Sequence, residues 1–289
     1  MSLAEAKDRS SQSCRPGMGT AVSSNESENP EIAKWDAAFT KRVITVMTPV
    51  ITRWFRAQVR GLESFPPVGG ALVVSNHSGG VLPPDWNIFA PAFYGRFGYE
   101  RPLYTLAHYG VFITPLAGSL HRLGVIHASR DNAAQALRSG AVVLDFPGGD
   151  YDAFRPTSAQ NVIDFHGRTG YVRTAIECGV PIVPAVSIGG QETQLFLTRG
   201  TWLAKRLGLN RIRMEILPMT LGFPYGLTVL FPANLPLPAQ ITYQVLQPID
   251  LVAQFGTNPD VDEVDTYVRS VMQTALDRLA HQRRLPVLG

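Results

Sequence analysis

Between residues 71 and 188, short apolar segments alternate with segments of helical periodicity, and this alternation is the strongest constraint on the fold. The apolar segments are four to seven residues long, which is typical of buried strands. Because a helical pattern follows nearly every expected strand, the chain predicts an α/β fold with a mostly parallel central sheet flanked by helices. The expected strands cover residues 71–75, 102–107, 125–128, 141–146 and 182–188, and the expected helices cover residues 85–93, 109–120, 132–138 and 170–178.

The first 60 residues divide into a polar tail and a helical segment. Residues 1–30 are rich in Ser, Asn, Glu and Gly, which predicts a disordered tail. Residues 31–60 carry apolar side chains at helical spacing and predict a helical pair that precedes the sheet, because Pro49 should kink the helix or split it in two. Trp35 and Trp54, with basic neighbours, suit the interface of an anionic membrane. A helical pair packed on the following domain explains the pattern equally well, and the two readings are compatible.

The last third of the chain predicts an irregular segment, a strand and a long helix. Residues 217–240 are rich in Pro and Leu and cannot form a regular helix or a central strand, so we expect an apolar irregular segment over the edge of the domain. Residues 241–246 predict a last strand, and residues 259–284 predict a helix. The domain boundaries that follow are a tail at 1–30, an amphipathic membrane platform at 31–60 and an α/β domain at 61–289. The expected buried face of the last helix consists of Val264, Val268, Val271, Ala275 and Leu279.

Composition excludes several classes of protein. The net charge of +3 is mild and no run of Lys and Arg is present, so nucleic acid is not an expected partner. The two cysteines, Cys14 and Cys178, imply no disulfide framework, which fits a reducing, cytosolic setting. We expect neither a signal peptide nor a transmembrane helix, since the first 30 residues are polar and no run of 18 apolar residues occurs.

The segment from Asn76 to Asp85 has the composition of a functional site. It follows the buried strand at 71–75 directly, so the strand fixes the position of His77. Gly79 and Gly80 allow a ligand to approach the backbone, and Asp85 can return to hold the imidazole. Histidine is also the side chain best suited to take and return a proton near neutral pH.

Three further blocks follow the His77 segment along the chain: Gly124-Val125-Ile126-His127-Ala128-Ser129-Arg130, Phe146-Pro147-Gly148-Gly149-Asp150-Tyr151-Asp152 and Val180-Pro181-Ile182-Val183-Pro184-Ala185-Val186. Together with the His77 segment they resemble, in order, the four blocks of the phospholipid/glycerol acyltransferase (lysophosphatidate acyltransferase-like) superfamily. The first is the His77…Asp85 motif, and the resemblance covers about residues 60–250. It implies a transfer of a fatty acyl group from acyl-CoA, or from acyl carrier protein, to a hydroxyl of a glycerolipid or lysophospholipid. The enzyme would need no cofactor beyond the acyl-CoA co-substrate and no metal.

Two departures from the family pattern bear on the site. Seven residues separate His77 from Asp85, where the family usually has four, so the pairing of these two residues is an open question. Tyr151 stands where the family usually has an Arg associated with the phosphate of the acceptor. Either Arg155 replaces that Arg or the acceptor is less anionic. The Phe-Pro-Gly-Gly block is closer to the diacylglycerol acyltransferase-like branch.

The resemblance implies a role for each residue of the site. His77 is the expected general base, Asp85 holds its ring, and backbone N–H groups near Gly148 and Gly149 stabilise the oxyanion. Arg130 suits a phosphate, although a surface Arg at a helix start is an equal alternative. Asp150 and Asp152 either bind acceptor hydroxyls or shape the turn. The expected substrate-binding residues are Asn76, Ser78, Gly79, Arg130, Phe146, Pro147, Gly148, Gly149, Asp150, Tyr151 and Arg155, and the remaining histidines that we interpret as structural are His108, His121, His127 and His166, of which His127 is a weak candidate for function.

Two other functions compete with the transferase. An acyl-thioester hydrolase could run on the same histidine with water, although the chain lacks the Gly-x-Ser-x-Gly of a serine esterase. A non-catalytic lipid-binding protein could retain the fold. The expected location is peripheral, at the cytoplasmic face of an anionic membrane, and the oligomeric state is open.

Overall fold

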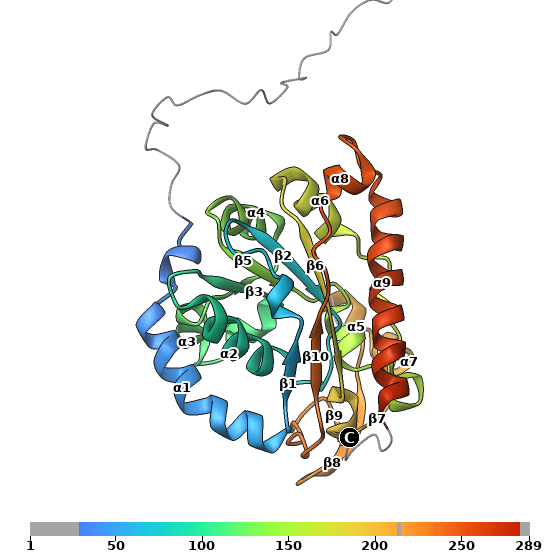
Figure 1. Cartoon of the computed structure of the whole chain (residues 1–289). Coiled ribbons are helices and arrows are strands. Elements are labelled where there is room, and N and C mark those ends of the chain that lie inside the picture. The colour runs from blue at the N-terminus through green and yellow to red at the C-terminus, as the bar shows by residue number, and fades with distance from the viewer. Residues whose placement is uncertain (1–28, 213–214, 284–289) are drawn as a thin grey trace, which may run out of the picture.

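The computed structural model describes residues 29–212 and 215–283, and its centre is a seven-stranded sheet (Figure 1). The strand order is β1-β10-β6-β2-β5-β3-β4. Neighbouring strands from β6 to β4 are parallel, whereas β10 is antiparallel to β6 and parallel to β1. The predicted α/β fold with a mostly parallel sheet is therefore confirmed. The strands are β1 (Gln58–Arg60), β2 (Ala71–Ser75), β3 (Leu103–Ala107), β4 (Val125–His127), β5 (Val142–Asp145), β6 (Ile182–Ile188) and β10 (Thr242–Val245).

Helices cover both faces of this sheet and create two cores. One core packs α1 and α2 against the sheet, and the other packs α4, α6 and α9 against the opposite face. Strand β2 shows the cause, because alternate side chains of a strand point to opposite faces. Ala71 and Val73 enter the first core, while Leu72 and Val74 enter the second. The α-helices are α1 (Ala37–Trp54), α2 (Asp85–Phe97), α3 (Ala117–Arg122), α4 (Arg130–Arg138), α5 (Gly149–Ala153), α6 (Gly170–Cys178), α7 (Thr201–Arg206), α8 (Leu251–Phe255) and α9 (Val261–Gln282).

The N-terminal helical pair consists of a 3-10 turn, η1 (Ile32–Lys34), and the helix α1. Pro49 lies inside α1, so the helix is not split at this proline. Ile44 and Phe55 are buried in the core of the sheet, and β1 joins the edge of the sheet, so this segment packs on the domain that follows. The predicted tail, except for its last two residues, lies outside the described part of the chain.

The prediction of one continuous helix at residues 109–120 is wrong, because this segment is divided in two. A 3-10 turn, η3, covers Tyr109–Ile113, and α3 begins only at Ala117. Thr114 between them has an extended backbone, with ψ of 156°. Pro115 follows it, and a residue that precedes proline is driven out of the helical region by steric conflict with the proline ring.

The region 217–240 is more regular than predicted. A small second sheet has the strand order β7-β8-β9, and all its strand pairs are antiparallel. Pro218 and Pro224 flank β8 and do not enter it, so neither removes a hydrogen bond from the ladder. The prediction that this region forms no central strand is wrong, because β8 lies between β7 and β9 and pairs with both, and the irregular segment is corrected to a hairpin. The strands are β7 (Leu195–Thr198), β8 (Met219–Gly222) and β9 (Gly226–Val229).

The last helix, α9, begins at Asp260, whose side chain accepts hydrogen bonds from the N–H groups of Asp262 and Glu263. Its buried face includes Met272 and Leu276 rather than Val271 and Ala275, which are half-buried neighbours. The other three predicted face residues are buried. None of the helices in residues 29–212 and 215–283 is both long and apolar enough to cross a bilayer.

Candidate active site

The candidate active site lies at the carboxyl ends of two adjacent parallel strands. In the register of β2 and β5, Val74 pairs with Asp145, so the residues that follow each strand emerge side by side. His77 follows β2 and Phe146 follows β5. The two rings stack with centroids 4.4 Å apart and planes at 29°. This edge of an open α/β sheet is where ligands usually bind.

His77 and Asp85 are in direct contact despite the seven residues between them. Nδ1 of His77 lies 3.0 Å from Oδ2 of Asp85, and the Asp85 side chain is fully buried at the start of α2. The backbone N–H of Ser78 donates to the same oxygen at 2.8 Å, and the Ser78 hydroxyl donates to Oδ1 at 3.1 Å. With its Nδ1–H directed at the carboxylate, the imidazole leaves Nε2 as the nitrogen able to accept a proton.

The long loop between these residues is compact because two glycines permit its turns. Gly79 and Gly80 have φ of 93° and 71°. A side chain on Gly79 would place its Cβ 2.6 Å from Cδ of Pro84, and one on Gly80 would lie 3.0 Å from the ring of Phe196. The extra residues are thus taken up in a tight loop that returns Asp85 to His77.

The sequence allowed two roles for Asp152, which are binding an acceptor hydroxyl and shaping the turn. Its buried carboxylate accepts a hydrogen bond from the backbone N–H of His77 at 2.7 Å. Gly148 makes this approach possible, because a Cβ there would lie 2.5 Å from Cβ of Asp152. Burial raises the pKa of Asp152, while the positive charge of Arg155 and the hydrogen bond from His77 oppose that rise. The geometry favours the turn-shaping role, since Asp152 joins the glycine turn to the His77 loop.

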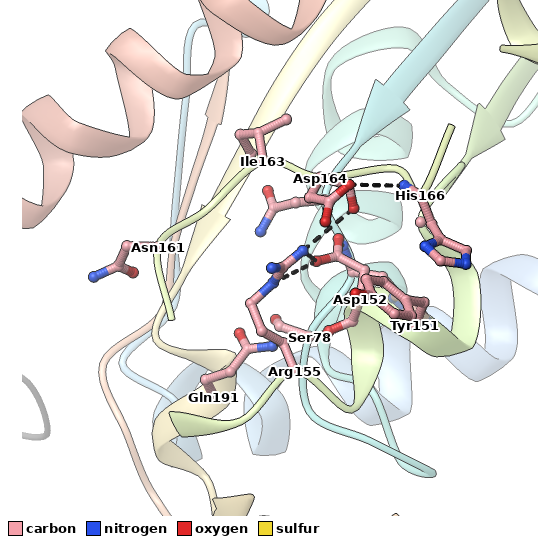
Figure 2. Close-up of polar contacts among 12 residues, drawn as sticks. Ser78, Tyr151, Asp152, Arg155, Asn161, Ile163, Asp164, His166 and Gln191 are labelled. Atoms are coloured by element: carbon pink, nitrogen blue, oxygen red, sulfur yellow. Dashed lines mark hydrogen bonds and ion pairs between the residues drawn. The ribbon is translucent and has the colours of Figure 1, made fainter. Parts of the chain in front are cut away.

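Arg155 lies in a buried ion pair with Asp152 (Figure 2). Its Nε and Nη2 donate to Oδ1 of Asp152 at 3.1 and 2.9 Å, and Nη2 also reaches the carbonyl of Asp164 at 3.2 Å. Only about 6% of its side chain is exposed. The guanidinium of Arg155 is therefore already bound to Asp152. This contact disfavours the alternative in which Arg155 replaces the phosphate-associated Arg of the family.

The sequence suggested that the backbone N–H groups of Gly148 and Gly149 could both stabilise an oxyanion, and only one of these two is available. The N–H of Gly149 donates to the carbonyl of Phe146 at 2.9 Å, whereas that of Gly148 has no partner among the described residues. Arg168 donates to the carbonyls of Pro147 and Gly148 at 3.3 and 3.0 Å and so fixes the turn from its other side. Gly149, at φ of 48°, leaves room for this guanidinium.

Tyr151 is held between two side chains that sequence reasoning did not connect with it. The guanidinium of Arg199 lies 3.6 Å from the centre of its ring, and Nε donates to the Tyr151 carbonyl at 2.6 Å. The ring of His166 stacks on the other side, with centroids 4.2 Å apart. Burial lowers the pKa of Arg199, and its Nη2 has no partner among the described residues. Nothing in the local sequence of Arg199 indicates this contact, because it depends on how the small sheet packs on α5.

Several predicted substrate-binding residues make contacts that support the site. Asn76 exchanges two hydrogen bonds of 2.8 Å with the backbone of Ser187 on β6. Ser78 is fully buried against Asp85. Asp150 is exposed and accepts from Arg168 at 3.2 Å. Asn76 and Ser78 shape the site from within, whereas Asp150 is open to solvent.

The contacts of Arg130 are with α6 and not with the His77 loop. Arg130 opens α4 behind the N-cap Ser129, and its exposed guanidinium pairs with Glu177 at 3.1 Å. This is the surface alternative that the sequence allowed. His127, in the same block, pairs through Nδ1 with Glu31 at 2.7 Å and so attaches the N-terminal segment to β4.

Comparison with known proteins agrees with this arrangement of motifs. Residues 56–188 match the model of the Acyltransferase family. An uncharacterized protein of Mycobacterium leprae is 32% identical over 237 residues, which is 80% of this chain and 62% of that protein. The human DGAT1/2-independent enzyme synthesizing storage lipids is 30% identical over 222 residues, which is 73% of this chain and 63% of the human protein.

Among solved structures, the 1-acyl-sn-glycerophosphate acyltransferase PlsC of Thermotoga maritima is 17% identical, with a TM-score of 0.49, and the match covers 84% of this chain and 78% of that one. The chain spans somewhat less than two thirds of the length of the mycobacterial and human relatives. The four ordered motifs and the match of residues 56–188 to the Acyltransferase family support a relationship of this chain to the phospholipid/glycerol acyltransferase superfamily.

Proposed function

We propose that the protein is an O-acyltransferase that moves a fatty acyl group from acyl-CoA, or from acyl carrier protein, to a hydroxyl of a glycerolipid or lysophospholipid. The observation that carries the proposal is the His77–Asp85 pair at the end of β2, with Phe146 stacked on the ring and no partner for Nε2 among the described residues. The match to the Acyltransferase family supports the reaction class.

The reaction needs a base because a neutral alcohol is a weak nucleophile. Nε2 of His77 takes the hydroxyl proton while the oxygen attacks the thioester carbon, and the carbonyl electrons move onto oxygen. The N–H of Gly148 stabilises that oxyanion. When the carbonyl re-forms, the C–S bond breaks and the thiolate of coenzyme A leaves. The proton held by His77 then passes to the thiolate, so the histidine ends unchanged and no acyl-enzyme forms.

We propose a weakly charged acceptor, of the diacylglycerol or monoacylglycerol kind. The family's phosphate-associated Arg is absent at Tyr151, and Arg155 is occupied by Asp152. The human relative is named for synthesizing storage lipids, which are neutral. A lysophospholipid remains the second acceptor class to be tested, with Arg130 as the proposed contact for a phosphate of the acceptor or of coenzyme A.

We propose a peripheral location at the cytoplasmic face of an anionic membrane. The outward face of α1 supports this, since it presents apolar side chains to solvent, with Val46 at 70% and Val50 at 61% exposure. Lys41, Arg42 and Arg53 on the same helix supply cations suited to anionic lipids.

The test of the reaction is release of free coenzyme A from palmitoyl-CoA in the presence of liposomes, with acceptors added one at a time. We expect release that depends on an acceptor, and His77→Ala should reduce it by about 10² to 10⁴-fold, the usual worth of general-base catalysis. His281→Ala, a change on the exposed last turn of α9, is the matched control and should retain activity.

The same assay separates the rival functions. Release without any acceptor would indicate a thioesterase. No release with any acceptor, from protein that still binds liposomes, would indicate a non-catalytic lipid-binding protein. Full activity of His77→Ala would reject this histidine as the base.

A further inference from the structure

The small sheet β7-β8-β9 has an apolar face that is turned outward. Alternate residues of its strands point to opposite faces, and the register places Leu195 opposite Leu221 and Leu221 opposite Leu227. These three leucines are exposed, at 43%, 44% and 57%. Val229, opposite Met219 at the far end of the ladder, is exposed as well. The outward face is thus a continuous apolar surface across all three strands.

The inward face of the same sheet is mixed, because Phe196 is buried there in a small apolar core with Phe154 and pairs with the polar Thr220. Thr220 and Thr228 are buried there and share a hydrogen bond of 3.1 Å. Asn234 is buried with them, and its Nδ2 donates to the hydroxyl of Thr228 at 3.3 Å and to the carbonyl of Gly226 at 2.9 Å. A sheet with one face in water normally has apolar residues inward and polar residues outward. The outward face departs from this pattern because it presents a row of leucines, which indicates that this face meets an apolar medium.

Aromatic and aliphatic side chains extend this surface beyond the strands. Phe223 and Tyr225 project from the turn between β8 and β9, with 62% and 58% exposure. Phe231, Leu235 and Leu237 follow β9 and are also exposed. The surface continues to α1, because the indole N–H of Trp54 donates to the carbonyl of Pro236 at 2.9 Å. Figure 1 shows the small sheet and the end of α1 together at the lower end of the molecule.

The charges around the surface favour an anionic bilayer as the partner. Between residues 193 and 240 the sequence carries five basic residues and one acidic residue, Glu215. On α7, Trp202, Lys205 and Arg206 are exposed together at the edge of the small sheet. Tryptophan beside Lys and Arg is the combination found where a protein surface meets lipid headgroups.

We infer that the outward face of β7-β8-β9 inserts into the surface of an anionic bilayer. It is a second membrane contact, distinct from α1. The inference rests on the proposed function only because that function makes lipid the partner. Its tests measure binding to vesicles and do not depend on enzymatic activity. The sheet also contacts the candidate site, since Gln194 donates to the carbonyl of Gly79 at 3.4 Å. Insertion of this face would therefore place the His77 loop near the lipid surface.

The first test replaces two leucines that face each other across β8 and β9. Leu221→Thr/Leu227→Thr keeps strand propensity and removes apolar surface. Flotation of the full chain with vesicles of phosphatidylcholine and phosphatidylglycerol should show a partition coefficient at least about tenfold lower than wild type. Val68→Thr/Val252→Thr, at two exposed positions outside the surface, is the control and should bind as wild type does. An unchanged partition coefficient for the leucine variant would overturn the inference.

The second test reports where the face lies. Leu227→Cys and Val252→Cys are each labelled with an environment-sensitive dye in a Cys14→Ser/Cys178→Ser background. Vesicles should shift the emission of the dye at 227 to the blue and leave that at 252 unchanged. Vesicle-bound protein without a shift at 227 would contradict insertion. A dimer without lipid that Leu221→Thr/Leu227→Thr converts to a monomer would also contradict it, because a second copy would then cover the face.

Discussion

At the scale of single residues, the site depends on two buried carboxylates that hold His77 from different sides. Asp85 contacts the ring through Nδ1, while Asp152 accepts a hydrogen bond from the backbone N–H. Asp152 is itself neutralised by Arg155. The ring and the backbone of the histidine are therefore fixed independently.

Asp152→Asn tests the support from the backbone side. The change leaves the guanidinium of Arg155 buried without its counter-charge, which typically costs about 3–5 kcal/mol. We expect a lower free energy of unfolding in urea and a fall in kcat, because the His77 loop loses its anchor. Asp152→Asn/Arg155→Met should recover part of the stability and little of the kcat. If the double variant is no more stable than the single variant, the ion pair is not the source of the loss.

Asp145, at the end of β5, predicts a pH dependence of stability. Desolvation raises its pKa to about 6 from 3.8, although the N–H of Phe146 and the charge of Arg168 oppose the rise. The folded state therefore binds more protons than the unfolded state between these values, so the contribution of Asp145 to stability is lost as pH rises through about 6. Asp145→Asn should be more stable than wild type by about 1–2 kcal/mol at pH 8, and the gain should shrink toward pH 5. Urea unfolding at both pH values is the measurement, and a gain independent of pH would contradict this cause.

At the scale of elements, the loop between β2 and α2 decides whether a histidine and an acid eight positions apart can meet. The loop returns because Gly79 and Gly80 adopt positive φ and Gly79 packs against Pro84. From the sequence, His77 and Asp85 could be chosen by residue type, but their contact could not, because it depends on this turn geometry.

Gly79→Ala should separate the pair without removing either partner. The added Cβ would strain a residue at φ of 93° and meet Pro84 at 2.6 Å, so the start of α2 must shift. We expect kcat to fall by more than about tenfold, since small displacements of catalytic groups are costly, with a smaller change in KM for the acyl donor. Gly69→Ala has a similar φ of 79° and nothing within 4 Å, so it carries the backbone strain alone and should retain kcat. Equal losses in both variants would mean that strain, and not the displacement of Asp85, is responsible.

Other elements show where sequence reasoning stops. Strands β2 and β6 and helix α6 lie within the predicted ranges, because each has a buried apolar run or a glycine that ends it. The apolar residues between 109 and 120 recur at helical spacing and so predict one helix. The steric effect of Pro115 on Thr114 interrupts that helix in the structure. Arg199 and Arg168 reach the site from distant segments, and no local pattern marks a contact of that kind.

At the scale of the whole molecule, the candidate site and the exposed apolar surface are parts of one packed unit. The small sheet contacts the His77 loop through Gln194 and contacts α5 through Arg199. The sequence predicted α1 as a membrane platform from its composition. It could not predict the role of residues 217–240, since the outward direction of the leucines follows from strand register and not from periodicity along the chain.

The hydrogen bond between Trp54 and Pro236 has a consequence for the strength of the proposed membrane attachment. It joins the end of α1 to the segment after β9, so the two apolar surfaces lie next to each other on the same molecule. Once one surface is in the bilayer, the other is held at a high effective concentration and adds its binding without a second loss of translational freedom. Two contacts that are each weak and reversible would together give a long residence time. On the proposed function, the protein would then meet many lipid molecules before it leaves the membrane.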